Sequence, residues 1–199
     1  PLARLPDTES IAAWVRRQPR MRDLVIEDDT VASTNPAVQL DLGGYAKGRA
    51  LDDAAAILQA HGIANALVNI GGNVIALGAH GSRPWRVGIQ HPRQPGTLAT
   101  LELRDGEAIG TSGDYQRYFE AGGRRYSHLI DPRSGYPATG MQSLTLLVSG
   151  AQAGTRSDAL SKPLFIDGPA RLPDNASRLG VANYLAVDAA GQIHASPAM

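Results

Sequence analysis

Asp158 and Lys162 are four residues apart in a segment whose composition predicts a helix, so both side chains would lie on one face of it. Such a pair is most often an ordinary ion pair on a helix surface. The chemical alternative is that Asp158 holds a hard cation such as Mg²⁺, together with phosphate oxygens and backbone carbonyls, which Mg²⁺ prefers as ligands. The spacing alone leaves both interpretations open.

A second candidate is the glycine-rich stretch Asp41 to Gly48 (DLGGYAKG), which joins an apolar segment to a predicted helix. Free N–H groups at a helix N-terminus attract anions, Lys47 adds positive charge, and glycines let the backbone approach a ligand closely. The stretch has neither the spacing of a P-loop nor that of the dinucleotide-binding fingerprint. The alternative is an ordinary strand-to-helix turn with a solvated lysine.

His128 stands three residues before Asp131, and Pro132 predicts a turn directly after it. An imidazole and a carboxylate at one strand end could act in general base catalysis. The alternative is that Asp131 caps the turn and that His128 is simply hydrogen-bonded. Asp114, in the preceding TSGDY segment, is a weaker candidate in the same region.

Gly71 and Gly72 lie between two apolar runs, in the sequence NIGGN. Paired glycines at such a position are typical of a tight hairpin turn. They could equally bring the backbone against a ligand. We therefore expect a hairpin here and retain both glycines as candidate binding residues.

Periodicity predicts the elements that must position these groups. Apolar residues at helical spacing predict three helices, at Thr8 to Arg17, Ala46 to Ala60 and Ala151 to Ile166. Pro163 should end or bend the last of them unless its neighbours compensate. Short apolar runs predict strands at Leu24 to Glu27, Ala37 to Leu40, Asn65 to Ile70, Val74 to Leu77, Trp85 to Ile89, Thr97 to Leu103, Glu107 to Ile109, Tyr115 to Glu120, Arg124 to Ile130, Ser143 to Val148 and Asn183 to Val187.

This order of helices and hairpins predicts an α+β fold with mixed, largely antiparallel sheets rather than regular βαβ winding. With 199 residues, of which 43% are hydrophobic, the chain is long enough to bury a core, and we expect a single domain over residues 1–199. Nineteen basic and nineteen acidic side chains cancel, which gives no support for nucleic-acid binding. There is no cysteine, and no apolar stretch approaches the roughly 20 residues that span a membrane.

Taken together and in this order, four segments resemble the ApbE family of FAD:protein FMN transferases. They are DLGGYAKGRALD, VNIGGN, TSGDYQRYFEAGGRRYSHLIDPRSGYP and SDALSKPLF, and the match runs from about Asp41 to Gly168. The resemblance implies an ApbE-like (T-fold-like) domain in which FAD lies in a cleft with its pyrophosphate near Mg²⁺. It also implies that a threonine or serine hydroxyl of an acceptor protein attacks the phosphate on the FMN side and releases AMP.

The resemblance assigns roles to residues at matching positions. Gly44 would offer its carbonyl to the metal and Asp158 its carboxylate. Lys47 and Ile130 fall at positions that contact FAD, and we expect Gly71 and Gly72 to line the same cofactor site.

His128 corresponds to the histidine associated with catalysis and would help to deprotonate the acceptor hydroxyl, while Asp131 would orient its loop. One position departs from the family pattern. Lys162 stands where a threonine oxygen usually helps to bind Mg²⁺, and a protonated lysine has no acceptor. Metal binding by residue 162 is the least secure part of the comparison.

The resemblance implies an acceptor protein of an electron-transport or metalloenzyme-maturation system, and a periplasmic or extracytoplasmic location. Family members carry more than a hundred further residues before this region, so we expect the chain to correspond to the C-terminal part of the usual domain. Two alternatives to transfer remain: a homologue that binds flavin or a partner without transferring FMN, and an FAD pyrophosphate hydrolase that uses water as the acceptor.

Overall fold

The computed structural model describes residues 5–199; the first four residues of the expected domain lie outside the described part. The helices are α1 (Thr8–Arg16), α2 (Ala46–Ala60), α3 (Ala153–Asp167) and α4 (Leu172–Arg178). The strands are β1 (Leu24–Glu27), β2 (Thr30–Ser33), β3 (Ala66–Ile70), β4 (Asn73–Leu77), β5 (Trp85–Gln90), β6 (Thr97–Leu103), β7 (Ala108–Gly113), β8 (Tyr118–Ala121), β9 (Arg124–Ser127), β10 (Ile130–Asp131), β11 (Tyr136–Pro137), β12 (Met141–Val148), β13 (Asn183–Asp188) and β14 (Ile193–Ala195).

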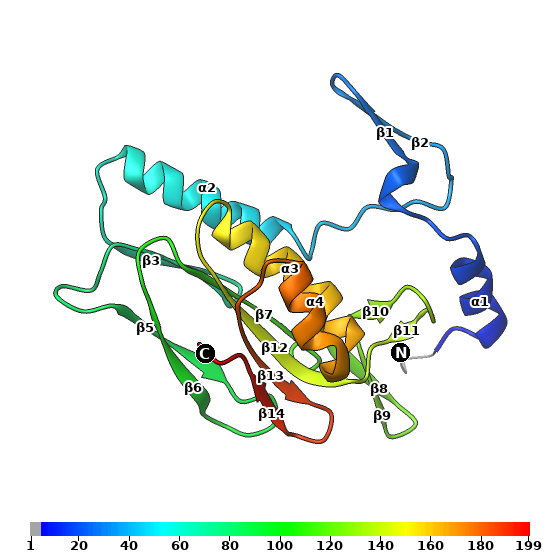
Figure 1. Cartoon of the computed structure of the whole chain (residues 1–199). Coiled ribbons are helices and arrows are strands. Elements are labelled where there is room, and N and C mark those ends of the chain that lie inside the picture. The colour runs from blue at the N-terminus through cyan, green and yellow to red at the C-terminus, as the bar shows by residue number, and fades with distance from the viewer. Residues whose placement is uncertain (1–4) are drawn as a thin grey trace.

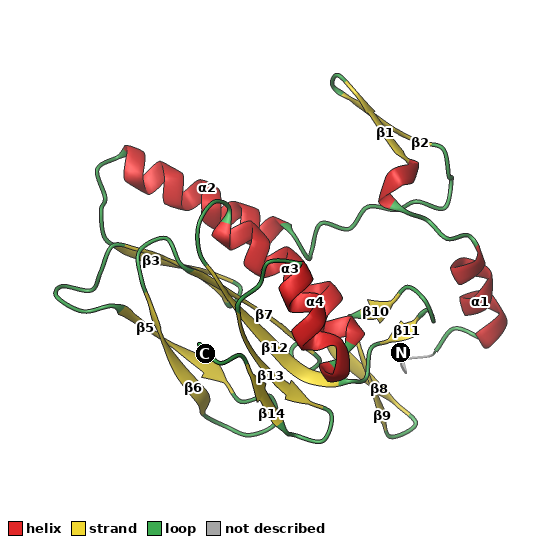
Figure 2. Cartoon of the chain, viewed as in Figure 1, coloured by secondary structure: helices red, strands yellow, loops and turns green. Residues whose placement is uncertain are grey.

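A six-stranded antiparallel sheet in the order β14-β13-β12-β7-β4-β3 forms the centre of the molecule. Helices α2, α3 and α4 lie together on one side of it, and the β5–β6 hairpin lies on the other (Figures 1 and 2). This arrangement confirms the predicted α+β class with antiparallel sheets.

Strand β4 shows why the sheet is covered on both faces. Its five residues are all buried. Ile75 and Leu77 belong to the core beneath the helices, whereas Val74 and Ala76 belong to a second core beneath β5 and β6. Because alternate strand residues point to opposite faces, the continuous apolar run of β4 fills both cores.

Helices α2 and α3 cross at a point where glycines face each other. A Cβ on Gly48 would lie 2.7 Å from the Cβ of Asp158, and a Cβ on Gly154 would lie 2.6 Å from the carbonyl oxygen of Gly48. Glycine at these two positions therefore lets the helices approach closely, and it brings the first turn of α2 against the middle of α3.

Pro163 does not end the third helix, because α3 continues through it to Asp167. The two residues that follow the proline, Leu164 and Phe165, are fully buried in the core beneath the helices. Burial of two large apolar side chains offsets the hydrogen bond that proline cannot donate.

The N-terminal segment carries little of the core. Asp7 caps α1 by accepting a hydrogen bond of 2.8 Å from the Ser10 N–H, as its position before the helix predicts. The β1–β2 hairpin projects from the rest of the molecule (Figure 1), and β2 is exposed along its whole length. The strand predicted at residues 37–40 is wrong: β1 pairs with β2 instead, and residues 37–40 are irregular.

Candidate functional site

The centre of the candidate site is the carboxylate of Asp158, whose side chain is fully buried in the middle of α3. Its Oδ2 accepts a hydrogen bond of 3.0 Å from the backbone N–H of Gly48, in the first turn of α2. The close crossing of the two helices makes this contact possible. The expected surface ion pair between Asp158 and Lys162 is thus wrong in one respect, since the carboxylate is buried.

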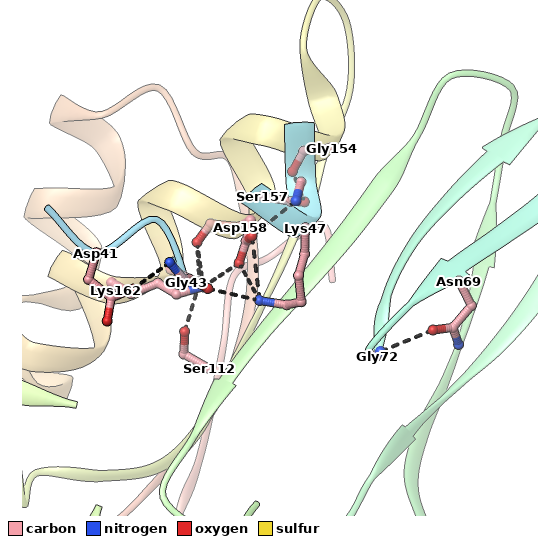
Figure 3. A network of polar contacts seen from close by, with 12 residues as sticks. Asp41, Gly43, Lys47, Asn69, Gly72, Ser112, Gly154, Ser157, Asp158 and Lys162 are labelled. Carbon is pink, nitrogen blue, oxygen red and sulfur yellow. Dashed lines mark hydrogen bonds and ion pairs between the residues drawn. The ribbon is translucent and has the colours of Figure 1, made fainter. Parts of the chain in front are cut away.

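Two ammonium groups meet this carboxylate (Figure 3). Lys162 Nζ contacts Asp158 Oδ1 directly and lies 2.9 Å from the Asp158 carbonyl oxygen. Lys47 Nζ lies 3.2 Å from the same Oδ1 and 3.3 Å from the carbonyl oxygen of Gly43. A glycine turn, the start of one helix and the middle of another therefore converge on one buried negative charge.

The charge state of Asp158 follows from these contacts. Burial works to raise the pKa of its carboxyl, but the hydrogen bond and charge of Lys162 and the Gly48 N–H outweigh burial and hold that pKa below its ordinary value. The Asn73 side-chain amide also favours the charged form, although its Nδ2 is buried without a hydrogen-bond partner. Asp158 is therefore ionised at neutral pH.

Gly44 lies against the aliphatic part of Lys162, where an added Cβ would be 3.2 Å from Lys162 Cε. Glycine at position 44 thus leaves room for the lysine stem. The backbone carbonyl that contacts an ammonium group here is that of Gly43, one residue before the carbonyl expected to bind metal. Metal binding by Gly44 stays a prediction.

Gly71 and Gly72 form the two-residue turn between β3 and β4, with φ angles of 57° and 90°. Positive φ at both central residues is the geometry of the predicted tight turn, which glycine adopts without strain. The Cα of Gly71 also faces Lys47, since an added Cβ would be 3.2 Å from Lys47 Cδ. The hairpin therefore borders the lysine, and the glycines' expected cofactor contact stays a prediction.

His128 follows β9 and is exposed, with Nδ1 3.0 Å from the carbonyl oxygen of Arg117. Partial burial of the ring lowers the pKa of His128, and the positive charges of Arg117, Lys162 and Lys47 lower it further. The imidazole is thus neutral at pH 7 and can accept a proton.

Asp131 does not pair with His128. It is the last residue of β10 and accepts hydrogen bonds of 2.9 Å from the Arg133 N–H and 2.8 Å from Arg133 Nε in the turn that follows. The hydrogen bond from the Arg133 side chain lowers the pKa of Asp131. They fit the turn-capping alternative, in which Asp131 holds the loop. Ile130, expected to contact FAD, is 46% exposed beside it.

Asp114 makes an ion pair of its own with Arg93. Both of its carboxylate oxygens accept hydrogen bonds from Arg93, at 2.7 and 2.6 Å. A two-point contact of this kind fixes the carboxylate and accounts for Asp114 structurally.

Sequence reasoning did not predict several polar contacts around the cluster. Ser161 and Ser112 are both buried, and their hydroxyls are 2.8 Å apart. Asp52 binds the N-terminus of α3, accepting hydrogen bonds of 2.8 Å from the N–H groups of Gly154 and Thr155. Both contacts join residues far apart in the chain, so no local pattern could have revealed them.

In this α+β domain, ammonium groups gather at a glycine turn and a helix N-terminus. The fold and site are therefore those of a protein that binds an anionic, phosphate-bearing ligand. Comparison with known proteins is more specific. The chain matches the ApbE family over residues 1–185. An FAD:protein FMN transferase of Rhodobacter capsulatus is 48% identical over 189 residues, which cover 95% of this chain and 36% of that protein. One from Klebsiella pneumoniae is 32% identical, over 92% of this chain and 53% of that protein.

Solved structures agree. The crystal structure of the ApbE protein of Thermotoga maritima superposes with a TM-score of 0.88 at 33% identity, covering 98% of this chain and 63% of that one. The apo form of the flavinyl transferase ApbE of Pseudomonas stutzeri gives 0.79 at 34% identity, over 98% and 60%. The chain belongs to the ApbE family. It spans about a third to a half of the length of the two curated relatives above.

Proposed function

We propose that this chain transfers FMN from FAD to a threonine or serine hydroxyl of an acceptor protein and releases AMP. The observation that carries the proposal is the position of Lys47 and Lys162, whose ammonium groups meet at the glycine turn before α2. A pyrophosphate is the part of FAD that needs such charge. The named activity of the relatives, flavin transfer, supports the same assignment.

In the proposed step, the acceptor oxygen attacks the phosphorus of the FMN half. A new P–O bond forms, the bond from that phosphorus to the bridging oxygen breaks, and the bridging oxygen leaves with AMP. The ammonium groups of Lys47 and Lys162 offset the negative charge that develops on the pyrophosphate. Neutral His128 takes the hydroxyl proton.

The resemblance also implies Mg²⁺, held by Asp158, Gly44 and an oxygen at position 162. Residues 5–199 contain no group of three or more His, Cys, Asp or Glu side chains that could hold a metal ion. The Asp158 Oδ1 already faces two ammonium groups, and protonated Lys162 offers no acceptor. The donor set therefore does not fit a divalent cation at Asp158.

The remaining parts of the proposal concern partners and place. The acceptor would be a protein of an electron-transport or metalloenzyme-maturation system, and the site of action periplasmic or extracytoplasmic. The resemblance to the ApbE family supports both the kind of acceptor and the location. Within residues 5–199, the structure contains no helix long and apolar enough to cross a membrane.

The test is to incubate the chain with FAD and a domain carrying a flavinylation threonine, and to record the acceptor's intact mass together with AMP. A mass gain equal to FMN, matched by AMP and lost when the acceptor threonine is changed to alanine, supports transfer. AMP without the acceptor would identify an FAD hydrolase instead. Bound FAD with neither product would identify a homologue that binds flavin without transferring FMN.

A further inference from the structure

The sequence contains only two lysines, Lys47 and Lys162, among its nineteen basic residues. The structure brings both to the same carboxylate, although 115 positions separate them (162 minus 47). A lysine ammonium is a compact point charge, unlike the planar guanidinium of the seventeen arginines (19 minus 2). Both lysine ammonium groups of this protein therefore lie at Asp158.

The Lys162 ammonium is surrounded by oxygens. Besides its contact with Asp158 Oδ1, Nζ lies 2.9 Å from the Asp158 carbonyl oxygen and 3.4 Å from Ser161 Oγ. Carboxylate, carbonyl and hydroxyl oxygens are also the ligands that a hard divalent cation selects. The ammonium thus fills an oxygen-lined position with positive charge.

Several features hold Lys162 there. The side chain is 21% exposed and its partner carboxylate is fully buried, so separating the pair would remove one of the two ammonium groups that offset this buried charge. The four-residue spacing on α3 sets the reach, and the absence of a side chain at Gly44 makes room for the lysine stem. A divalent cation at the same carboxylate would be repelled by two ammonium groups within a few ångströms.

We propose that Lys162 takes the place of a divalent cation, so that this site holds the pyrophosphate of its ligand through the ammonium groups of Lys47 and Lys162 and needs no metal. Two ammonium groups against one carboxylate leave a net charge of +1 for an anion, and the positive end of α2 adds to it. The inference rests on the proposed function for the identity of the ligand, FAD, but not for the absence of a metal.

The direct test is Mn²⁺ binding, followed by electron paramagnetic resonance, because it needs no activity. Wild-type chain should bind Mn²⁺ at least about 100-fold more weakly than Lys162→Thr, which removes the ammonium and supplies an oxygen. Lys162→Met, which removes the charge without adding a ligand, should fall between them. Tight Mn²⁺ binding by wild type that disappears in Asp158→Asn would overturn the proposal.

The second test uses the unaltered chain, so it does not depend on how the variants fold. With ¹³C at the lysine ε-carbon, the two lysines give two NMR signals. Inorganic pyrophosphate in the presence of EDTA should shift both signals, whereas Mg²⁺ alone should shift neither. Signals that move with Mg²⁺, or that respond to pyrophosphate only when Mg²⁺ is present, would contradict the proposal.

These outcomes separate the inference from the proposed function. Metal-free pyrophosphate binding without any FMN transfer would leave the inference standing and remove the function. Transfer that is abolished by EDTA, together with wild-type Mn²⁺ binding, would do the reverse.

Discussion

The Asp158 cluster and the His128–Asp131 segment are built in opposite ways. The cluster is buried, and two helices packed on a six-stranded sheet hold it. In the segment His128 and Ile130 are exposed, Asp131 is half-buried and Leu129 is buried, and contacts between backbone and side chains, such as His128 Nδ1 to the Arg117 carbonyl, hold it. The groups proposed to bind the pyrophosphate are therefore already held in place by the fold, whereas the histidine proposed to accept a proton lies where an acceptor protein can reach it.

The largest effect is expected in the buried Asp158 cluster. Asp158→Asn leaves two ammonium groups without their counter-charge, so it should lower the free energy of unfolding by about 3 kcal/mol. Urea denaturation measures it. The matched control is Asp53→Asn, which removes an exposed pair with Arg49 on α2 and should cost no more than about 0.5 kcal/mol. Equal losses in the two variants would mean that the burial of Asp158 has no energetic consequence.

In the His128–Asp131 segment, a substitution should change the rate of transfer much more than the stability of the fold. His128→Ala removes the proposed proton acceptor and should slow FMN transfer on the order of 100-fold or more. Stability should change little, because His128 is exposed and makes one hydrogen bond. Intact-mass kinetics and urea denaturation of the same preparation measure the two effects. A variant that transfers FMN at the wild-type rate would remove His128 from the mechanism.

The pH dependence of transfer follows from the pKa of His128, which burial and nearby positive charges hold below its ordinary value of 6.5. Only the neutral imidazole accepts a proton, so the rate should be level above about pH 6.5 and fall at lower pH, through the folded pKa. The unfolded chain takes up this proton first, so His128 also makes the fold less stable as pH drops below 6.5. A rate that falls already above pH 7 would contradict this assignment.

The smallest effect is expected at Asp131. Asp131→Asn weakens an exposed ion pair with Arg133 and should cost about 1 kcal/mol or less. Transfer should slow far less than in His128→Ala, because Asp131 holds the turn and does not contact the imidazole. Side-by-side transfer rates of the two variants decide between a turn-holding and a catalytic carboxylate; equal losses would restore the catalytic role.

Local pattern was sufficient for much of the fold. The apolar spacing of α2 predicted its bounds, Ala46–Ala60, and the paired glycines predicted the β3–β4 turn. Local pattern did not predict β2. Every residue of this strand is exposed, so burial does not select apolar residues at alternate positions in it. At Pro163 local pattern could not decide between an end, a bend and an uninterrupted helix, because the packing of Leu164 and Phe165 is a tertiary effect.

The site followed the same division. The four-residue spacing of Asp158 and Lys162 was visible in the sequence, but their burial was not, because it depends on α3 lying against β7 and α2. The contact of Lys47 with Asp158 joins residues 111 positions apart. Sequence motifs named these residues through the family resemblance, and only the fold showed that they share one charge cluster.

The central claim is that this cluster binds the pyrophosphate of FAD, and the most direct measurement is the FAD dissociation constant of Lys47→Met. Losing one charged contact should weaken FAD binding about 10-fold or more, whereas Arg49→Met, an exposed change two residues along the same helix, should leave it unchanged. Wild-type affinity in Lys47→Met, with both variants folded, would contradict the claim and place the cofactor elsewhere.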